Sequence, residues 1–270
     1  MREMAALAAE AARAGARELR ARAADLGRVR TKSSAVDVVT EADVASGVAV
    51  VGLLKDRVGS ALRVVVEEDE VYGLTGIMPA SPEEDGVWLI DPLDGTTSFV
   101  HGYPCYSVSV ALLRSGQPVA GAVYNLPAEE MSLAWSGGGA WMNGKRVSCS
   151  AVSTRERALL ATGFPYEREA AFTRQMRVFE RLVRGAHDVR RDGSAAVDCC
   201  HVAAGRCDGY WEFGLKTWDM AAGVVILREA GVLVTDIRGE PWTTATADLL
   251  AANARLHGLL LADIAAAEER

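Results

Sequence analysis

The chain lacks the features that mark membrane, secreted or nucleic-acid-binding proteins. Its longest uncharged apolar stretch near the N-terminus, residues 44–54, is far too short to span a bilayer. Residues 1–30 are interrupted by Glu10, Arg13 and Arg17, so no signal peptide is expected. The formal net charge is −7, whereas binding to a phosphate backbone requires a basic surface. The sequence therefore predicts a cytoplasmic protein with neither a membrane nor a nucleic-acid partner.

Paired cysteine and histidine motifs are also missing. The 5 cysteines show no C-x-x-C spacing, which favours a reducing compartment over a disulfide framework. Cys199 and Cys200 lie in an apolar stretch, where burial is favoured over zinc binding. The 4 histidines are dispersed without an H-x-x-x-H pair, so their spacing gives no reason to expect a histidine metal ligand.

The most informative stretch is residues 87–97, Val-Trp-Leu-Ile-Asp-Pro-Leu-Asp-Gly-Thr-Thr, in which an apolar run stops on two carboxylates. Its β-branched and aromatic residues predict a strand, and Pro92, which has no N–H group, is expected to end the strand's ladder. Asp91 and Asp94 then converge across a turn, where cations would relieve their repulsion. The run therefore predicts a divalent metal site at the end of a strand.

The residues that follow this acidic pair favour an anion at the same place. Gly95 lets a ligand approach the backbone closely, and Thr96 and Thr97 are helix N-cap residue types whose following N–H groups would point at an anion. An Asx-turn with a helix cap is the structural alternative. That alternative accounts for only half of the set, so the pattern favours a site where metal and phosphate meet.

Two further acidic positions occur at predicted element ends. The strand at residues 64–66 stops on Glu67, Glu68 and Asp69, and Asp219 is expected to cap a helix of small and apolar residues. Together, Glu67, Asp91, Asp94 and Asp219 make the kind of ligand set that a multi-magnesium phosphatase needs.

The remaining pattern predicts a mixed α/β fold. Helices are expected at residues 4–26, 41–57, 172–183, 195–204 and 219–230, and strands at 64–66, 87–90, 106–113, 118–124, 131–135, 140–142, 209–213 and 231–236. Asn143-Gly144 predicts a hairpin turn, and the glycine run at 137–139 is interpreted as hairpin and not as a phosphate loop. A soft boundary near residues 150–157 divides the chain into halves 1–150 and 151–270, packed as one compact unit.

With these residues in view, the chain strongly resembles the inositol monophosphatase family, within the lithium-sensitive, magnesium-dependent sugar phosphatases. The resemblance is carried by the segments 32–43, 67–68, 88–102, 193–196 and 211–223. Its most specific parts are the D-P-x-D-G-T-T and W-D-x-A-A-G motifs. It implies a layered αβαβα sandwich, two or three Mg²⁺ ions and a homodimer.

The resemblance also implies roles for individual residues. The metal ligands would be Glu67, Asp91, the Leu93 carbonyl, Asp94 and Asp219. Glu67 and Thr96 would position and activate the attacking water, with the Asp43 carboxylate orienting the Thr96 hydroxyl. Donors of Gly95 and Thr96 would hold the phosphate of the substrate. Its sugar side would be lined by Gly193, Ser194 and Ala195, with Glu212 accepting hydrogen bonds from its hydroxyls. Asp94 and Asp219 would also bind the substrate.

Two positions depart from the family pattern. Val66 stands where the family usually has glycine, which leaves open whether Glu67 or Glu68 faces the metal. Ser98 replaces the usual asparagine, a change expected to affect only the hydrogen bonds that support the metal ligands.

The sequence thus predicts a Mg²⁺-dependent phosphomonoesterase acting on inositol 1-phosphate or a similar small polyol phosphate. The alternatives are phosphatases of the same superfamily that act on histidinol phosphate, fructose 1,6-bisphosphate or 3′-phosphoadenylate. Glu212, Phe213 and Lys216 are expected to decide among these substrates as pocket residues. A further alternative is a regulatory protein that kept the fold and binds RNA or a protein partner.

Overall fold

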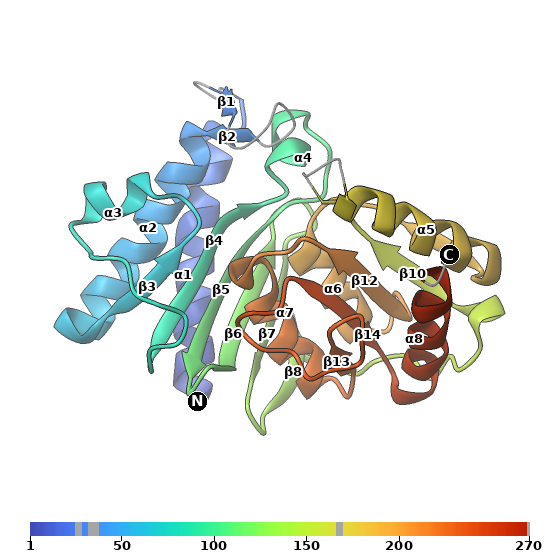
Figure 1. The fold of residues 1–270 in the computed structure, drawn as a ribbon. Helices are drawn as coiled ribbons and strands as arrows, with labels where there is room; N and C mark the ends of the chain where they lie inside the picture. The colour runs from blue at the N-terminus through green and yellow to red at the C-terminus, as the bar shows by residue number, and fades with distance from the viewer. Residues whose placement is uncertain (25–28, 32–37, 166–169, 269–270) are drawn as a thin grey trace.

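The computed structural model of the protein describes residues 1–24, 29–31, 38–165 and 170–268 (Figure 1). Its helices are α1 (Arg2–Arg22), α2 (Glu41–Val58), α3 (Glu70–Thr75), α4 (Thr96–Val100), α5 (Ala170–Gly185), α6 (Ala195–Ala203), α7 (Thr217–Glu229) and α8 (Ala254–Glu268). Its strands are β1 (Val29–Thr31), β2 (Val38–Thr40), β3 (Arg63–Val66), β4 (Val87–Asp94), β5 (Ser107–Arg114), β6 (Gln117–Asn125), β7 (Glu130–Trp135), β8 (Gly139–Met142), β9 (Lys145–Val147), β10 (Leu159–Thr162), β11 (Asp188–Arg190), β12 (Gly209–Phe213), β13 (Leu233–Thr235) and β14 (Asp248–Ala252). The family-like segment at 32–37 lies outside the described residues.

Two sheets and three helical layers alternate through the molecule. The larger sheet has the order β3-β4-β5-β6-β7-β8-β9, and the smaller has the order β11-β10-β12-β14-β13. Figure 1 shows α1 and α2 on the outer face of the larger sheet, α6 and α7 between the sheets, and α5 and α8 on the outer face of the smaller sheet. The predicted αβαβα sandwich is therefore confirmed.

Three apolar cores hold these layers together. Alternate residues of a strand face opposite sides of its sheet, so one strand contributes side chains to two of the cores. In β4, Ile90 packs with the core under α1 and α2, whereas Leu89 packs with the core around α6 and α7. In β12, Tyr210 faces the central core and Trp211 faces the outer core beneath α5 and α8. The same alternation decides which residues at the ends of these strands reach the site.

Most predicted elements occur close to their expected positions, with three corrections that bear on the site. The β4 ladder does not end at Pro92: the strand runs on to Asp94, with a register shift between Asp91 and Asp94. Helix α7 starts two residues before Asp219, so Asp219 is the third helical residue and not the cap. Gly95, in a left-handed conformation, occupies the cap position of α4 in place of a threonine.

Several elements were not predicted, among them the short β10, β14 and α3 and the longer helix α8. The buried runs of β10 and β14 show no alternation of polar and apolar residues, so their periodicity does not distinguish strand from helix. Within the described ranges, no helix combines the length and the apolarity needed to cross a bilayer.

Candidate active site

A one-residue irregularity in β4 brings Asp91 and Asp94 to the same site. In a regular strand, two residues three apart point to opposite faces. Here Asp91 pairs with Ser109 while Asp94 pairs with Ser107, so one extra residue is accommodated between them. This is the geometry of a β-bulge, where a proline is tolerated because a ladder bond is already lost. Both carboxylates consequently line one cavity of about 350 Å³.

Asp94 is held by the N-terminus of α6. Its Oδ2 accepts hydrogen bonds from the Ser194 hydroxyl at 2.6 Å and from the backbone N–H of Ala196 at 2.8 Å. The Ser194 hydroxyl also caps α6 by accepting from the N–H of Val197 at 3.3 Å. A helix N-terminus favours a carboxylate, so this contact fixes Asp94 and joins the two sheet systems.

Glu67 and Asp219 complete the acidic wall of the cavity. Glu67 follows β3, which lies parallel to β4, so the carboxyl ends of both strands meet at one edge. Asp219 reaches the cavity from the first turn of α7, where its Oδ2 accepts from the N–H of Lys216 at 2.8 Å. Glu68 is buried and is not among the cavity residues, so Glu67 is the glutamate of this pair that faces the site.

The acidic wall fits a hard divalent cation. Burial raises the pKa of Asp91, Asp94 and Asp219, and the neighbouring carboxylates, Glu67 in particular, raise it further. Carboxylates crowded in this way repel one another unless protons or cations balance them. Since all the donors are oxygens, Mg²⁺ and similar ions match the set.

Thr96 and Asp43 form a buried hydrogen-bonded pair beside the acidic wall. The Thr96 hydroxyl lies 3.0 Å from Asp43 Oδ1 and 3.1 Å from the Leu93 carbonyl oxygen. Asp43 Oδ2 accepts from the N–H of Thr40 at 2.9 Å and from its hydroxyl at 2.6 Å, within the capping box of α2. Burial raises the pKa of Asp43 to about 6. Asp43 does not line the cavity, and its contact with the cavity residue Thr96 is the hydrogen bond from the Thr96 hydroxyl.

Gly95 allows the two halves of the site to approach each other. Its φ is +92°, and an added Cβ would lie 2.9 Å from the Cys105 carbonyl oxygen and 3.1 Å from that of Gly193. Gly193 and Ala195, which were predicted for the sugar side of the substrate, both line the cavity. Ser194 does not line it, because its hydroxyl is turned to Asp94 and to the first turn of α6.

Glu212 enters the cavity from the end of β12. Its Oε2 accepts a 2.6 Å hydrogen bond from the Tyr210 hydroxyl, and burial raises its pKa to about 7. The carboxyl group lies directly against Gly163, where an added Cβ would be 2.1 Å from Oε2. Phe213 was expected to face the pocket, which is wrong: strand alternation turns its side chain into the outer core, under the Arg174 guanidinium at 4.9 Å.

The structure adds cavity residues that sequence reasoning missed. They are Gly163, Phe164, Pro165, Arg191, Gly214, Leu215 and Trp218. Of the described cavity residues, Arg191 and Lys216 carry the positive charges. Arg191 precedes Gly193 of the family-like segment by two residues, and this proximity could have indicated that it lines the cavity. Residues 163–165 follow β10, a strand that was not predicted.

The fold and the cavity together define a class: an αβαβα protein whose oxygen-rich cavity suits metal-dependent phosphate chemistry. The family model described as "Inositol monophosphatase family" matches residues 1–269, and the chain belongs to this family. This family of metal-dependent phosphatases agrees with the acidic wall of the cavity, and it indicates that the protein is a phosphatase.

Individual relatives give the same result. "Phosphatase IMPL1, chloroplastic" from Arabidopsis thaliana is 41% identical over 239 residues, which cover 86% of this chain but 62% of that protein, less than two thirds of its length. "Putative Nus factor SuhB" from Neisseria meningitidis serogroup B is 37% identical over 257 residues, which cover 95% of each chain. The structure of the inositol monophosphatase from Anabaena (Nostoc) sp. PCC 7120 is similar with a TM-score of 0.84 and 34% identity, over 98% of this chain and 96% of that one.

Proposed function

We propose that the protein is a Mg²⁺-dependent phosphomonoesterase that hydrolyses inositol 1-phosphate or a similar small polyol phosphate. The observation that carries this proposal is that four carboxylates and Thr96 line one cavity, with Asp43 hydrogen-bonded to Thr96 from behind it. Glu67, Asp91, Asp94, Asp219 and the Leu93 carbonyl would hold two or three Mg²⁺ ions. Bound there, the ions would neutralise the charge of the phosphate and of the attacking oxygen.

The residues around the acidic wall would orient the attacking water and the phosphate. Because the Thr96 hydroxyl donates its proton to Asp43, its lone pairs are available to accept a hydrogen bond from water. Glu67 lines the same cavity and supplies a carboxylate that can take a proton from that water. Gly95 and Thr96 would donate to the phosphate oxygens, while Asp94 and Asp219 border the substrate as well as the metals.

Glu212 favours a neutral, hydroxyl-rich group next to the phosphate. A buried carboxylate accepts hydrogen bonds from vicinal hydroxyls and repels a second phosphate. Arg191 and Lys216 line the same cavity and oppose this repulsion. The balance among these three side chains keeps histidinol phosphate, fructose 1,6-bisphosphate and 3′-phosphoadenylate as alternative substrates.

A phosphate-release assay across these four substrates, with and without Mg²⁺, tests the proposal. Inositol 1-phosphate should have the highest kcat/KM, activity should disappear with a chelator, and Li⁺ should inhibit. Glu212→Gln should lower kcat/KM for the polyol substrate by about ten- to a hundredfold, the range for a lost charge-assisted hydrogen bond, and affect a simple aryl phosphate less. A bisphosphate that leads on the wild type would overturn the polyol assignment, and activity without divalent ions would overturn the metal dependence.

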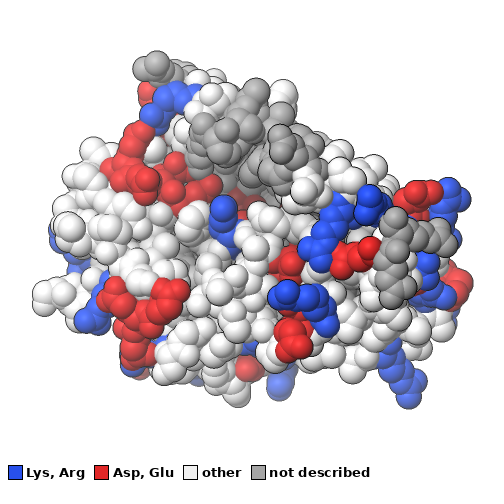
Figure 2. Space-filling view, in the orientation of Figure 1, with Lys and Arg blue, Asp and Glu red and all other residues white. Residues whose placement is uncertain are grey.

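A second function is favoured by the name of the Neisseria relative, a putative Nus factor. The protein would then also act through a macromolecular partner in the cytoplasm, as a homodimer. On the face in Figure 2, basic side chains are scattered and form no continuous tract, which favours a protein partner over RNA on that face. Affinity capture with the wild type and with Asp94→Asn, which is expected to keep the fold, would test this role, because a partner retained by both proteins acts independently of catalysis.

A further inference from the structure

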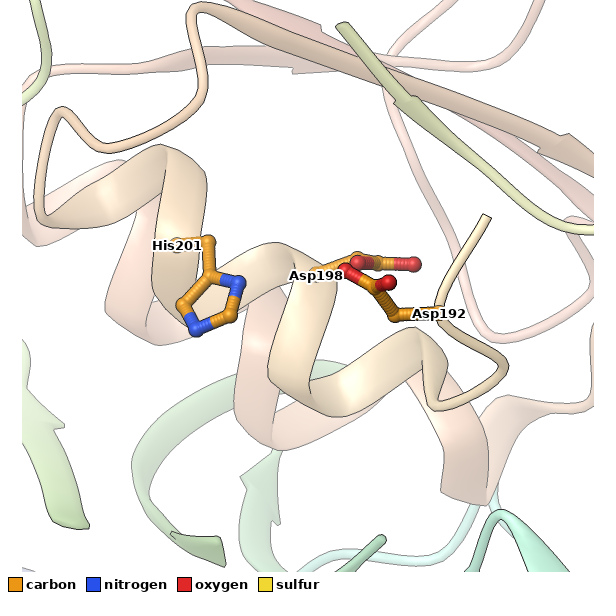
Figure 3. A group of neighbouring side chains, drawn as sticks. All are labelled: Asp192, Asp198 and His201. Atoms are coloured by element: carbon orange, nitrogen blue, oxygen red, sulfur yellow. The ribbon is translucent and has the colours of Figure 1, made fainter. Parts of the chain in front are cut away.

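A second group of possible metal ligands lies outside the cavity, among Asp192, Asp198 and His201. Each offers one ligand atom, a carboxylate oxygen or an imidazole nitrogen, and these atoms lie within 4.8 Å of one another. Asp198 and His201 are three residues apart on α6, so they share one side of the helix. Asp192 approaches from the segment that joins β11 to α6. Figure 3 shows the two carboxylates beside each other and a ring nitrogen of His201 on their side.

Asp198 is the residue that points to a ligand. Its side chain is 1% exposed, and its Oδ1 has no hydrogen-bond partner among the described residues. A buried carboxylate oxygen without a donor is destabilising, so such an atom calls for an explanation by an ion or another bound group. Burial raises the pKa of Asp198, the negative charges of Glu212, Asp192 and Asp94 raise it further, and Arg191 opposes them. Within the group, Asp192 and Asp198 thus place two carboxylates close together. A cation between the carboxylates would balance both charges.

The state of His201 suits a transition-metal ion. Burial and the nearby Arg206 lower its pKa, whereas Glu130 and Asp192 oppose this, and the neutral imidazole is the form that binds metals. Imidazole is a preferred ligand of zinc and its neighbours, whereas Mg²⁺ prefers oxygen ligands alone. The three side chains therefore differ in kind from the all-oxygen wall of the cavity.

We propose that Asp192, Asp198 and His201 form a second metal site that binds Zn²⁺ or a similar divalent transition metal. A tetrahedral ion with bonds near 2.1 Å would bring its ligand atoms to about 3.4 Å from one another. Asp192 lies outside helices and strands, so a small shift of its side chain can bring the ligand atoms from within 4.8 Å of one another to this separation. Water would be the fourth ligand of the ion. The ion would tie the segment that carries Arg191 and Gly193 to α6, the helix whose N-terminus holds Asp94.

Zinc binding to the chelator-treated protein tests the site. Zn²⁺ is titrated into the wild type and into His201→Gln, with excess Mg²⁺ present, and bound equivalents are measured by competition with a chromophoric chelator. The wild type should bind one equivalent more than His201→Gln. His187→Gln, which alters an exposed histidine, should behave as the wild type. In ¹⁵N-labelled protein, Zn²⁺ should shift an imidazole nitrogen signal that is absent from His201→Gln.

Asp192→Asn provides a second variant that does not disturb α6. It should also lose the extra equivalent while keeping the far-ultraviolet circular dichroism of the wild type. Equal zinc uptake by the wild type, His201→Gln and Asp192→Asn, or imidazole signals that Zn²⁺ leaves unchanged, would overturn the proposal. Neither readout depends on phosphatase activity, so the result is separate from the outcome of the substrate assays.

Discussion

Without metal, the protein should be more stable in mild acid than in mild base, and Glu212 should contribute much of this dependence. Burial raises the pKa of Glu212 in the folded state to about 7, against an ordinary value of 4.5. Between these two values the folded state holds a proton that the unfolded state has lost. The stabilisation from this group is therefore complete below pH 4.5 and is lost as the pH rises through 7.

The size of the effect follows from the two pKa values. Their difference, 7 minus 4.5, corresponds to about 3 kcal/mol of unfolding free energy. Asp43 and Asp94 change stability in the same direction, since burial raises the pKa of each to about 6. Glu212→Gln should remove the contribution of Glu212 alone, because the amide oxygen can still accept from the Tyr210 hydroxyl.

Urea unfolding at a series of pH values from about 5 to 8.5, in the presence of a chelator, measures this dependence. The wild type should lose more stability over this range than Glu212→Gln, by a margin approaching 3 kcal/mol, roughly the value expected from linkage. Glu240→Gln, at an exposed position, is the matched control and should follow the wild type. Mg²⁺ should flatten the wild-type curve because bound cations favour ionised carboxylates. Parallel curves for the wild type and Glu212→Gln would refute this reasoning.

Three further predictions concern the same cavity. Asp94→Asn should lower kcat at saturating Mg²⁺ by about a hundredfold or more while the fold is kept, whereas the surface variant Asp56→Asn should have no effect. Near-normal turnover of Asp94→Asn would contradict a metal-ligand role. Thr96→Ala and Glu67→Gln should each lower kcat more than they raise KM, with non-additive losses in the double variant. A larger loss of kcat for Glu68→Gln than for Glu67→Gln would mean that Glu68, and not Glu67, faces the metal. Gly163→Ala should displace the Glu212 carboxyl group and lower kcat/KM for polyol phosphates more than for an aryl phosphate. Equal losses of kcat/KM on the two substrates would contradict the placement of Glu212 beside the polyol group.

The acidic positions could be predicted from the sequence because each lies close to an end of a recognisable element. Apolar runs stop on Glu67 and on Asp91, which marks the end of β3 and the point where β4 becomes polar, and the parallel pairing of β3 with β4 places both positions near one edge of the sheet. The bulge between Asp91 and Asp94 could not be predicted in the same way. Proline indicates a broken ladder, but whether the strand stops or continues past the break depends on its pairing with β5, which is a long-range property.

Glu212 and Phe213 show a case in which the sequence held more information than was used. Both were expected at the pocket, although adjacent residues of a strand face opposite sides of the sheet. Assigning Glu212 to the cavity places Phe213 in the outer core without any further knowledge. Ser194 differs, because its contact with Asp94 joins residues that are 100 positions apart, and no local pattern indicates it.

The substrate side of the cavity depends on the topology of the smaller sheet, and this explains why its residues escaped prediction. β10 runs parallel to both β11 and β12, so the carboxyl ends of these three strands lie at one edge. Gly163 follows β10, Arg191 follows β11, and Glu212 lies near the end of β12. Ligands bind at the carboxyl ends of parallel strands because the chain leaves the sheet there and exposes its loops. Three segments that are unrelated in sequence thus form one wall, and recognising β10 as a strand would have been enough to place Gly163 against Glu212.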